Sequence, residues 1–94
     1  MKKSELTAAP LASFRFGMRR WLYEQFASYD DAEVDAVIAT LFSYIEAEKL
    51  GRRTGFGSEV LRRSWDLALG YFAESQHATD ESLGKLLGVK APPR

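Results

Sequence analysis

Apolar side chains recur along most of this chain at intervals of three or four residues, the spacing that places them on one face of an α-helix. The first such segment carries Leu11, Phe14, Met18, Trp21, Leu22 and Phe26. Pro10 suits the first turn of a helix, because the N–H that proline lacks is not needed there. The pattern therefore predicts a first helix from Pro10 to about Ser28.

The second helix has the clearest end signals in the chain. Asp30-Asp31-Ala32-Glu33 has the form of a capping box and places acidic side chains at the positive end of the helix dipole. Lys49 and Gly51 provide a basic last turn and a stop. Between these ends the apolar positions are Val34, Val37, Ile38, Leu41 and Ile45.

Three glycines within residues 51–57 then interrupt the helical spacing. Ser58 can cap a third helix that ends near Gln76, and Thr79 can start a short fourth helix that stops at Gly88. No segment shows the alternation of a strand. We therefore expect an all-α fold: a small antiparallel bundle of three main helices plus a short C-terminal helix, in one domain of residues 1–94 with an ordered core at about 10–89.

Composition limits the number of cores, the cellular compartment and the membrane association that this domain can have. An apolar content of 46% is enough for one core, and 94 residues leave room for only one. The absence of cysteine excludes disulfides, thiolate catalysis and cysteine-rich zinc sites, and it fits a reducing compartment. No apolar run is long enough for a signal peptide or a membrane span. We expect a cytoplasmic protein that does not enter a membrane.

Charge is balanced in number, with 13 basic and 13 acidic residues, but not along the chain. In an antiparallel bundle the start of the first helix, the end of the second and the start of the third share one end. That end is predicted to be basic, whereas the cluster from Asp30 to Asp35 lies at the other end. The alternative is that Glu46, Glu48 and Glu59 neutralise these cations in ordinary surface ion pairs.

The connection after the second helix carries the chemistry of a binding site. Arg52 and Arg53 supply forked donors for a carboxylate or a phosphate, and Phe56 supplies an aromatic face. The segment lacks the Gly-Lys-Ser/Thr of a P-loop, and the alternative is an ordinary connector with Phe56 packed on the bundle end. The predicted partner-binding residues are Arg15, Arg19, Arg52, Arg53, Phe56, Arg62 and Arg63.

Several aromatic side chains lie beyond the stripe that one core requires. An exposed apolar patch on a small protein usually marks an interface, and a symmetric dimer is the commonest assembly. We therefore expect a homodimer, unless the fourth helix covers part of this surface. The predicted self-association residues are Phe16, Tyr23, Phe42 and Trp65.

Enzymatic chemistry finds little support in the sequence. Glu74 and the single histidine, His77, form half of the Glu-x-x-His pattern of di-metal bundles, and the other half is absent. The hydroxyl residues Thr54, Ser58 and Ser64 have no histidine at a suitable position. We therefore expect no catalytic residue, no bound metal and no cofactor.

The stretch Thr79–Lys90 resembles the first helix and turn of a helix-turn-helix, but Ala91-Pro-Pro-Arg94 follows where the recognition helix belongs. The function that the sequence favours is a non-enzymatic protein-binding module, such as an adaptor, a regulator or a phage-type inhibitor, that occupies a partner's surface. The alternative is a nucleic-acid-binding regulator that uses the basic end. Salt dependence separates the two, because phosphate contacts weaken steeply with ionic strength.

Overall fold

Four helices follow one another along the part of the chain that the structure describes. This computed structural model describes residues 3–93, with side chains from Leu11 onward. The helices are α1 (Lys3–Gln25), α2 (Asp31–Leu50), α3 (Ser58–Phe72) and α4 (Asp80–Leu87), and no strand occurs among these residues. The predicted small all-α bundle, with three main helices and a short C-terminal helix, is confirmed.

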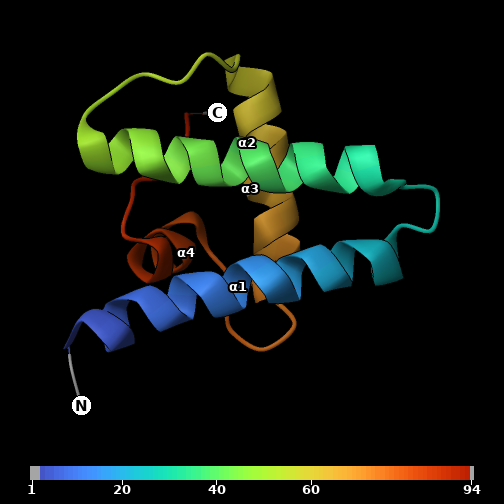
Figure 1. The fold of residues 1–94 in the computed structure, drawn as a ribbon, viewed down its shortest axis with the longest axis horizontal. Coiled ribbons are helices and arrows are strands. Elements are labelled where there is room, and N and C mark those ends of the chain that lie inside the picture. Colours follow the sequence, from blue (N-terminus) through green and yellow to red (C-terminus); the bar gives the residue numbers. More distant parts are fainter. Residues whose placement is uncertain (1–2, 94) are drawn as a thin grey trace.

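The helices pack as one antiparallel pair crossed by a third helix. α1 and α2 run in opposite directions, and α3 crosses behind both of them at a steep angle (Figure 1). α4 packs against α3, close to α1 in the view. Because α3 crosses the pair instead of running alongside it, the start of α3 does not lie where α2 ends.

The ends of α2 and α4 follow the local signals in the sequence. The Asp30 carboxylate accepts a hydrogen bond from the backbone N–H of Glu33 at 2.9 Å, and Gly51 ends α2 with a φ of 68°. Thr79 and Ser82 form a capping box at the start of α4, and Gly88 ends it with a φ of 76°. These predicted ends are confirmed.

Several helix ends differ from the sequence predictions. Ser58 is the first residue of α3 and not its cap, because Gly57 holds the N-cap position and no side chain caps this end. α1 begins at Lys3, so Pro10 lies inside the helix instead of starting it; residues 3–9 include glutamate, leucine and alanine, which favour helix strongly. α3 ends at Phe72 and not near Gln76. It ends there because the backbone N–H groups of Glu74 and Ser75 bond to carbonyls three residues back, which tightens the chain into turns.

The core lies where all four helices meet. α1 contributes Phe14, Met18 and Leu22, and α4 contributes Leu83 and Leu87. The remaining buried apolar side chains come from α2 and α3: Val34, Val37, Ile38, Leu41, Tyr44, Ile45, Trp65 and Ala68. None of the described helices combines the length and the apolar character that a membrane-spanning helix needs.

Trp65 sits at the centre of this core. Its exposed fraction is 0%, its indole N–H donates to Asp80 at 3.0 Å, and its ring meets that of Tyr44 edge to face. The prediction that Trp65 belongs to a self-association surface is therefore wrong. α4 folds back against α3 and buries it, as the alternative prediction for the fourth helix required.

The residues after α4 return across the bundle as an extended segment, the C-terminal strap (Gly88–Pro93). The Tyr44 hydroxyl donates to the carbonyl of Lys90 at 2.6 Å, and Arg62 donates to the carbonyl of Pro92 at 3.1 Å. Pro92 is buried. Through Pro93 this strap takes the place in which a helix-turn-helix has its recognition helix, so the resemblance to that motif ends at α4.

Candidate functional site

The arginines predicted to share one end fall into separate surroundings, and Arg62 is the most enclosed. Its exposed fraction is 9%. Its guanidinium donates to both carboxylate oxygens of Asp80, at 2.8 and 3.0 Å, and to Asp66 at 3.0 Å. The hydrogen bonds to Asp80 raise the pKa of Arg62 above its ordinary value. Arg62 holds helices together, and its prediction as a partner-binding residue is wrong.

Arg19 and Arg63 also lie away from the predicted basic end. Arg19 forms an ion pair with Asp35 near the start of α2, and Arg63 donates to the Tyr29 hydroxyl at 2.7 Å, in the connection between α1 and α2. Both residues therefore lie at the acidic end, and their predicted place at the basic end is wrong. Arg63 reaches this position because α3 crosses α2.

The predicted basic end survives in a smaller form around the last turns of α2. We call it the basic–aromatic surface, and its members are Leu11, Arg15, Phe42, Glu46, Lys49, Leu50, Arg52, Arg53 and Phe56. Two adjoining hollows of about 490 and 280 Å³ mark it, and both are lined by Glu46 and Leu50. The structure thus brings Arg15, Arg52, Arg53 and Phe56 to one surface, as the sequence predicted.

The larger hollow lies between α1 and α2. Arg15 and Leu11 of α1 form one side, and Phe42 and Lys49 of α2 form the other. The Arg15 guanidinium lies over the Phe42 ring, 5.0 Å from its centroid. Such a contact stabilises by roughly 0.5–1 kcal/mol at an exposed site and holds the cation in place. It also covers part of Phe42, one of the predicted self-association residues.

The smaller hollow lies between α2 and residues 51–57. Arg52, Arg53 and Phe56 line it, and the backbone N–H of Phe56 donates to the Thr54 hydroxyl at 3.4 Å. The exposed fractions of Leu50 and Phe56 are 56% and 42%, so two large apolar side chains remain in water beside two arginines. The alternative prediction, that Phe56 packs on the bundle end, does not fit this exposure.

The cations of this surface are not neutralised by the acids that the sequence offered for that purpose. Among the side chains of residues 11–93, Arg15, Arg52 and Arg53 form no ion pair with Glu46, Glu48 or Glu59. The arginines that do pair use Glu24, Asp35, Asp66 and Asp80. The ion-pair alternative is therefore wrong for this surface.

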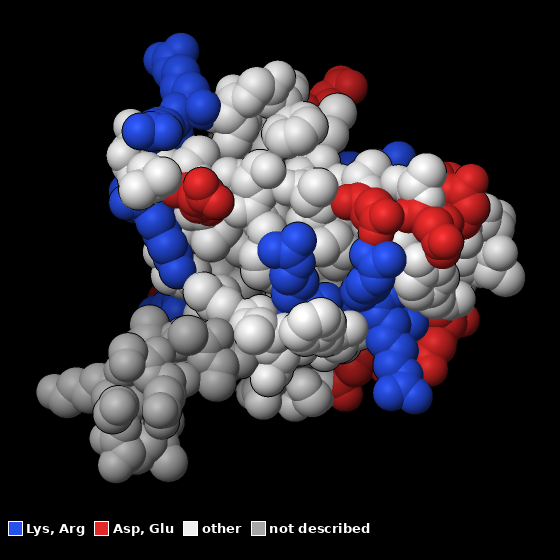
Figure 2. All heavy atoms as spheres, viewed as in Figure 1, with Lys and Arg blue, Asp and Glu red and all other residues white. Residues whose placement is uncertain are grey.

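The space-filling view shows the resulting charge distribution. Lys and Arg gather over the end of α2 and the connection that follows it, with an acidic side chain among them (Figure 2). Asp and Glu gather at the opposite end, over the turn from α1 to α2, where basic side chains reach in among them. The acidic end is thus compensated locally, while the basic end has fewer acids around it.

Of the remaining predicted self-association residues, Phe16 is the one that faces water freely. Its exposed fraction is 71%. Tyr23 is exposed as well, but its hydroxyl donates to Asp31 at 2.7 Å, and the Arg19 guanidinium lies over its ring. Self-association stays a prediction, and it now depends mainly on Phe16.

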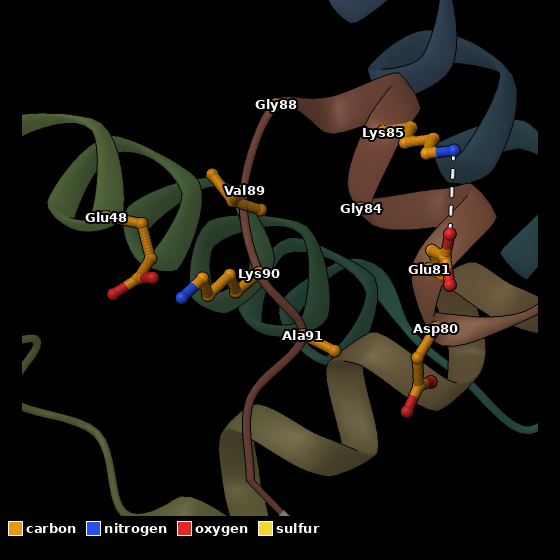
Figure 3. A pocket seen from close by; sticks show the side chains of 9 residues that line it. All are labelled: Glu48, Asp80, Glu81, Gly84, Lys85, Gly88, Val89, Lys90 and Ala91. Atoms are coloured by element: carbon orange, nitrogen blue, oxygen red, sulfur yellow. Dashed lines mark ion pairs between the residues drawn. The ribbon is translucent and has the colours of Figure 1, made fainter.

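A further hollow of about 820 Å³ lies elsewhere, between the end of α2, α4 and the C-terminal strap. Glu48 and Lys90 point toward each other on one side of it, and Glu81 and Lys85 form an ion pair on the other side (Figure 3). Asp80 is engaged by Arg62 and Trp65. The lining holds no hydroxyl, imidazole or thiol group.

The Glu74 and His77 pair does not form a helical half-site. Both residues follow the end of α3, in the exposed connection to α4. Among the described residues, no three His, Cys, Asp or Glu side chains gather closely enough to hold a metal ion. Comparison with known proteins gives no match for this chain among protein-family models, curated proteins or solved structures.

Proposed function

We propose that this chain is a non-enzymatic protein-binding module, an adaptor, regulator or inhibitor, that occupies a partner's surface through its basic–aromatic surface. One observation carries the proposal. Arg15, Arg52 and Arg53 have no carboxylate partner among the described side chains, and they lie beside the exposed Leu50 and Phe56. The cysteine-free composition supports a cytoplasmic location.

Arginine next to exposed aromatic and aliphatic groups is the typical composition of a protein-binding hot spot. Burial of Leu50 and Phe56 against a partner removes apolar area from water. A hydrogen bond from Arg52 or Arg53 to a partner's carboxylate involves a charged group and stabilises by about 1.5–3 kcal/mol. The same surface therefore supplies both affinity and orientation.

Nucleic acid is the second candidate, because the same cations attract phosphate. Glu46 counts against it. This carboxylate lines both hollows, between Arg15 on one side and Arg52 on the other. A phosphate backbone laid along the surface places negative charge over Glu46, whereas a protein can present an anion to the arginines and a neutral group to the glutamate.

The test compares two double variants of the full chain. A protein partner is first captured from extracts of the natural source and identified by mass spectrometry, and its affinity is then measured by calorimetry. Arg52→Ala with Arg53→Ala should weaken binding at least about tenfold. Arg20→Ala with Lys85→Ala removes the same charge from exposed sites elsewhere and should leave the affinity unchanged.

Both double variants should melt close to the parent temperature, since exposed charges contribute about 0–1 kcal/mol. Equal affinity of the parent and the Arg52/Arg53 variant for the identified partner contradicts the proposal. A duplex DNA probe that binds with a log–log salt slope of several units, and that loses affinity in the Arg52/Arg53 variant, favours the nucleic-acid candidate instead.

A further inference from the structure

We infer that the basic–aromatic surface takes an acidic segment of a protein partner that carries two apolar side chains, and that Glu46 excludes an acidic residue between them. The inference rests on the proposed function of this surface and adds the chemistry of the partner. Three observations carry it: the paired hollows, the placement of the cations, and the position of Glu46.

The two hollows meet along one line of α2. Phe42, Glu46 and Leu50 are four residues apart and therefore lie on one face of the helix. Glu46 and Leu50 line both hollows, with α1 beyond the larger one and residues 51–57 beyond the smaller one. Glu46 and Leu50 therefore form a ridge between the two hollows. A segment that crosses the end of α2 over this ridge meets one hollow on each side of it.

Each hollow can accept an apolar side chain. Leu11, Phe42 and Ile45 contribute apolar surface to the larger one, and Leu50 and Phe56 contribute it to the smaller one. Their volumes are about 490 and 280 Å³. For comparison, an apolar cavity of about 150 Å³ is enough to hold a benzene ring.

The arginines line the two hollows from the sides that face α2, while Lys49 of α2 also lines the larger one. Arg52 and Arg53 lie on residues 51–57, and Arg15 lies across α2 on α1, held over the Phe42 ring. Carboxylates at both ends of the incoming segment can therefore form charge-assisted hydrogen bonds, and forked pairing with arginine adds directional specificity. The acidic end of a second copy of this chain is a poorer occupant, because Asp31 and Asp35 are already engaged by Tyr23 and Arg19.

Glu46 determines which residue type the partner segment can place between its two apolar side chains. It is exposed, and no ion pair joins it to another side chain of residues 11–93. An acidic residue over the ridge meets this like charge, whereas a neutral or basic residue does not. Repulsion of this kind discriminates between partners in addition to the attraction that the arginines supply. The recognised sequence is acidic, apolar, non-acidic, apolar, acidic.

The test uses a random-peptide library displayed on phage and selected against the immobilised full chain. Peptides selected by the parent protein should carry Asp or Glu outside two large apolar positions and none between them. In a synthetic peptide of this pattern, an acidic residue at the central position should weaken binding by the parent about tenfold. Glu46→Gln should remove most of that difference, and Glu46→Lys should reverse it.

Matched controls separate specificity from folding. Glu24→Gln removes an exposed carboxylate outside the surface and should leave the central preference unchanged. Circular dichroism should show equal helix content and melting in all variants, because Glu46 is exposed. Selected peptides with acids at the centre, peptides without acidic enrichment, failure to select any peptide, or an unchanged preference in Glu46→Gln overturn the inference.

Failure of the inference and failure of the proposed function give different results. If binding of the natural partner depends on Arg52 and Arg53 but the selected peptides lack the pattern, the protein-binding function is supported and the inference about an acidic segment is wrong. If the natural partner is indifferent to both arginines, the proposed function of the surface falls, whatever the peptides show.

Discussion

The guanidinium of Arg62 on α3 donates two hydrogen bonds, of 2.8 and 3.0 Å, to the carboxylate of Asp80, the first residue of α4. Trp65 donates to the same carboxylate, and Arg62 also donates to the carbonyl of Pro92. One nearly buried side chain therefore joins α3, α4 and the C-terminal strap. Arg62 has the fixed planar fork that this arrangement requires, which lysine lacks.

Replacing Arg62 should therefore lower stability strongly. Arg62→Lys keeps the charge but leaves one Asp80 oxygen and the Pro92 carbonyl without their donor. We expect a loss of about 1–3 kcal/mol in the free energy of unfolding, the cost of leaving enclosed polar groups without a hydrogen-bond donor, because lysine keeps the positive charge of the pair. Urea denaturation measures this loss. Arg20→Lys, in an exposed pair with Glu24, is the control and should cost less than about 1 kcal/mol; equal losses in the two variants contradict the assignment.

A second prediction concerns the close approach of α1 and α3. A Cβ atom added at Gly17 would lie 1.8 Å from the Tyr71 hydroxyl oxygen, so the ring must move. Gly17→Ala should destabilise the protein by about 1–2 kcal/mol, because the cost of overpacking exceeds the roughly 0.5–1 kcal/mol that alanine gains over glycine inside a helix. Tyr71→Phe in the same chain should restore part of the loss, since it removes the nearest atom.

Gly55→Ala is the matched control for this prediction, because nothing lies within 4 Å of the Cβ it adds. Thermal melts of the three variants decide the matter. The contact between Gly17 and Tyr71 does not limit the packing of the two helices if Gly17→Ala and Gly55→Ala melt at the same temperature. The same conclusion follows if adding Tyr71→Phe to Gly17→Ala does not raise the melting temperature.

The difference between what was and was not predictable follows from the range of the interactions. The ends of α2 depend on short-range bonds: the Asp30 carboxylate accepts from the backbone N–H of Glu33, and the backbone N–H of Gly51 donates to carbonyls three and four residues back, so a local pattern reveals them. Arg62 bonds to Asp80 and Pro92, 18 and 30 positions away. No spacing rule pairs such positions before the crossing of α3 is known.

The same reasoning explains the candidate site. Arg52, Arg53 and Phe56 follow directly after α2, so their place near its end required only the end of that helix. Arg15 joins them because α1 and α2 form an antiparallel pair with a short connection. Arg63 was misplaced because its position depends on the angle of α3, and Trp65 because its burial depends on α4.

A third prediction concerns stability at high pH. Burial raises the pKa of Tyr44 above its ordinary value of 10.0, and its protonated hydroxyl donates to the Lys90 carbonyl. A group whose pKa is raised by folding stabilises the fold below its unfolded pKa and loses that contribution as the pH rises through the folded value. Unfolding free energy should therefore fall from about pH 10 upward.

Tyr44→Phe isolates this effect from the titration of lysines and of Tyr23, whose pKa is also raised, mainly by its hydrogen bond to Asp31. The variant should be less stable than the parent at pH 7 by about 1 kcal/mol, the contribution of one hydrogen bond. Above pH 10 the difference should shrink. Urea titrations at a series of pH values that give a constant difference contradict this role of Tyr44.

The last prediction concerns Phe16, the most exposed large apolar side chain of the described residues. We expect a homodimer in which Phe16 loses its contact with water, because an isolated aromatic side chain on α1 gains most from burial against a second copy. Phe16→Glu should shift sedimentation from dimer to monomer without lowering the melting temperature of the monomer, since Phe16 makes little contact within its own chain. Leu86→Glu, an exposed apolar position on α4, is the control and should leave the dimer intact. A parent protein that sediments as a monomer at every concentration contradicts self-association, and a dimer that survives Phe16→Glu moves the interface to another part of the surface.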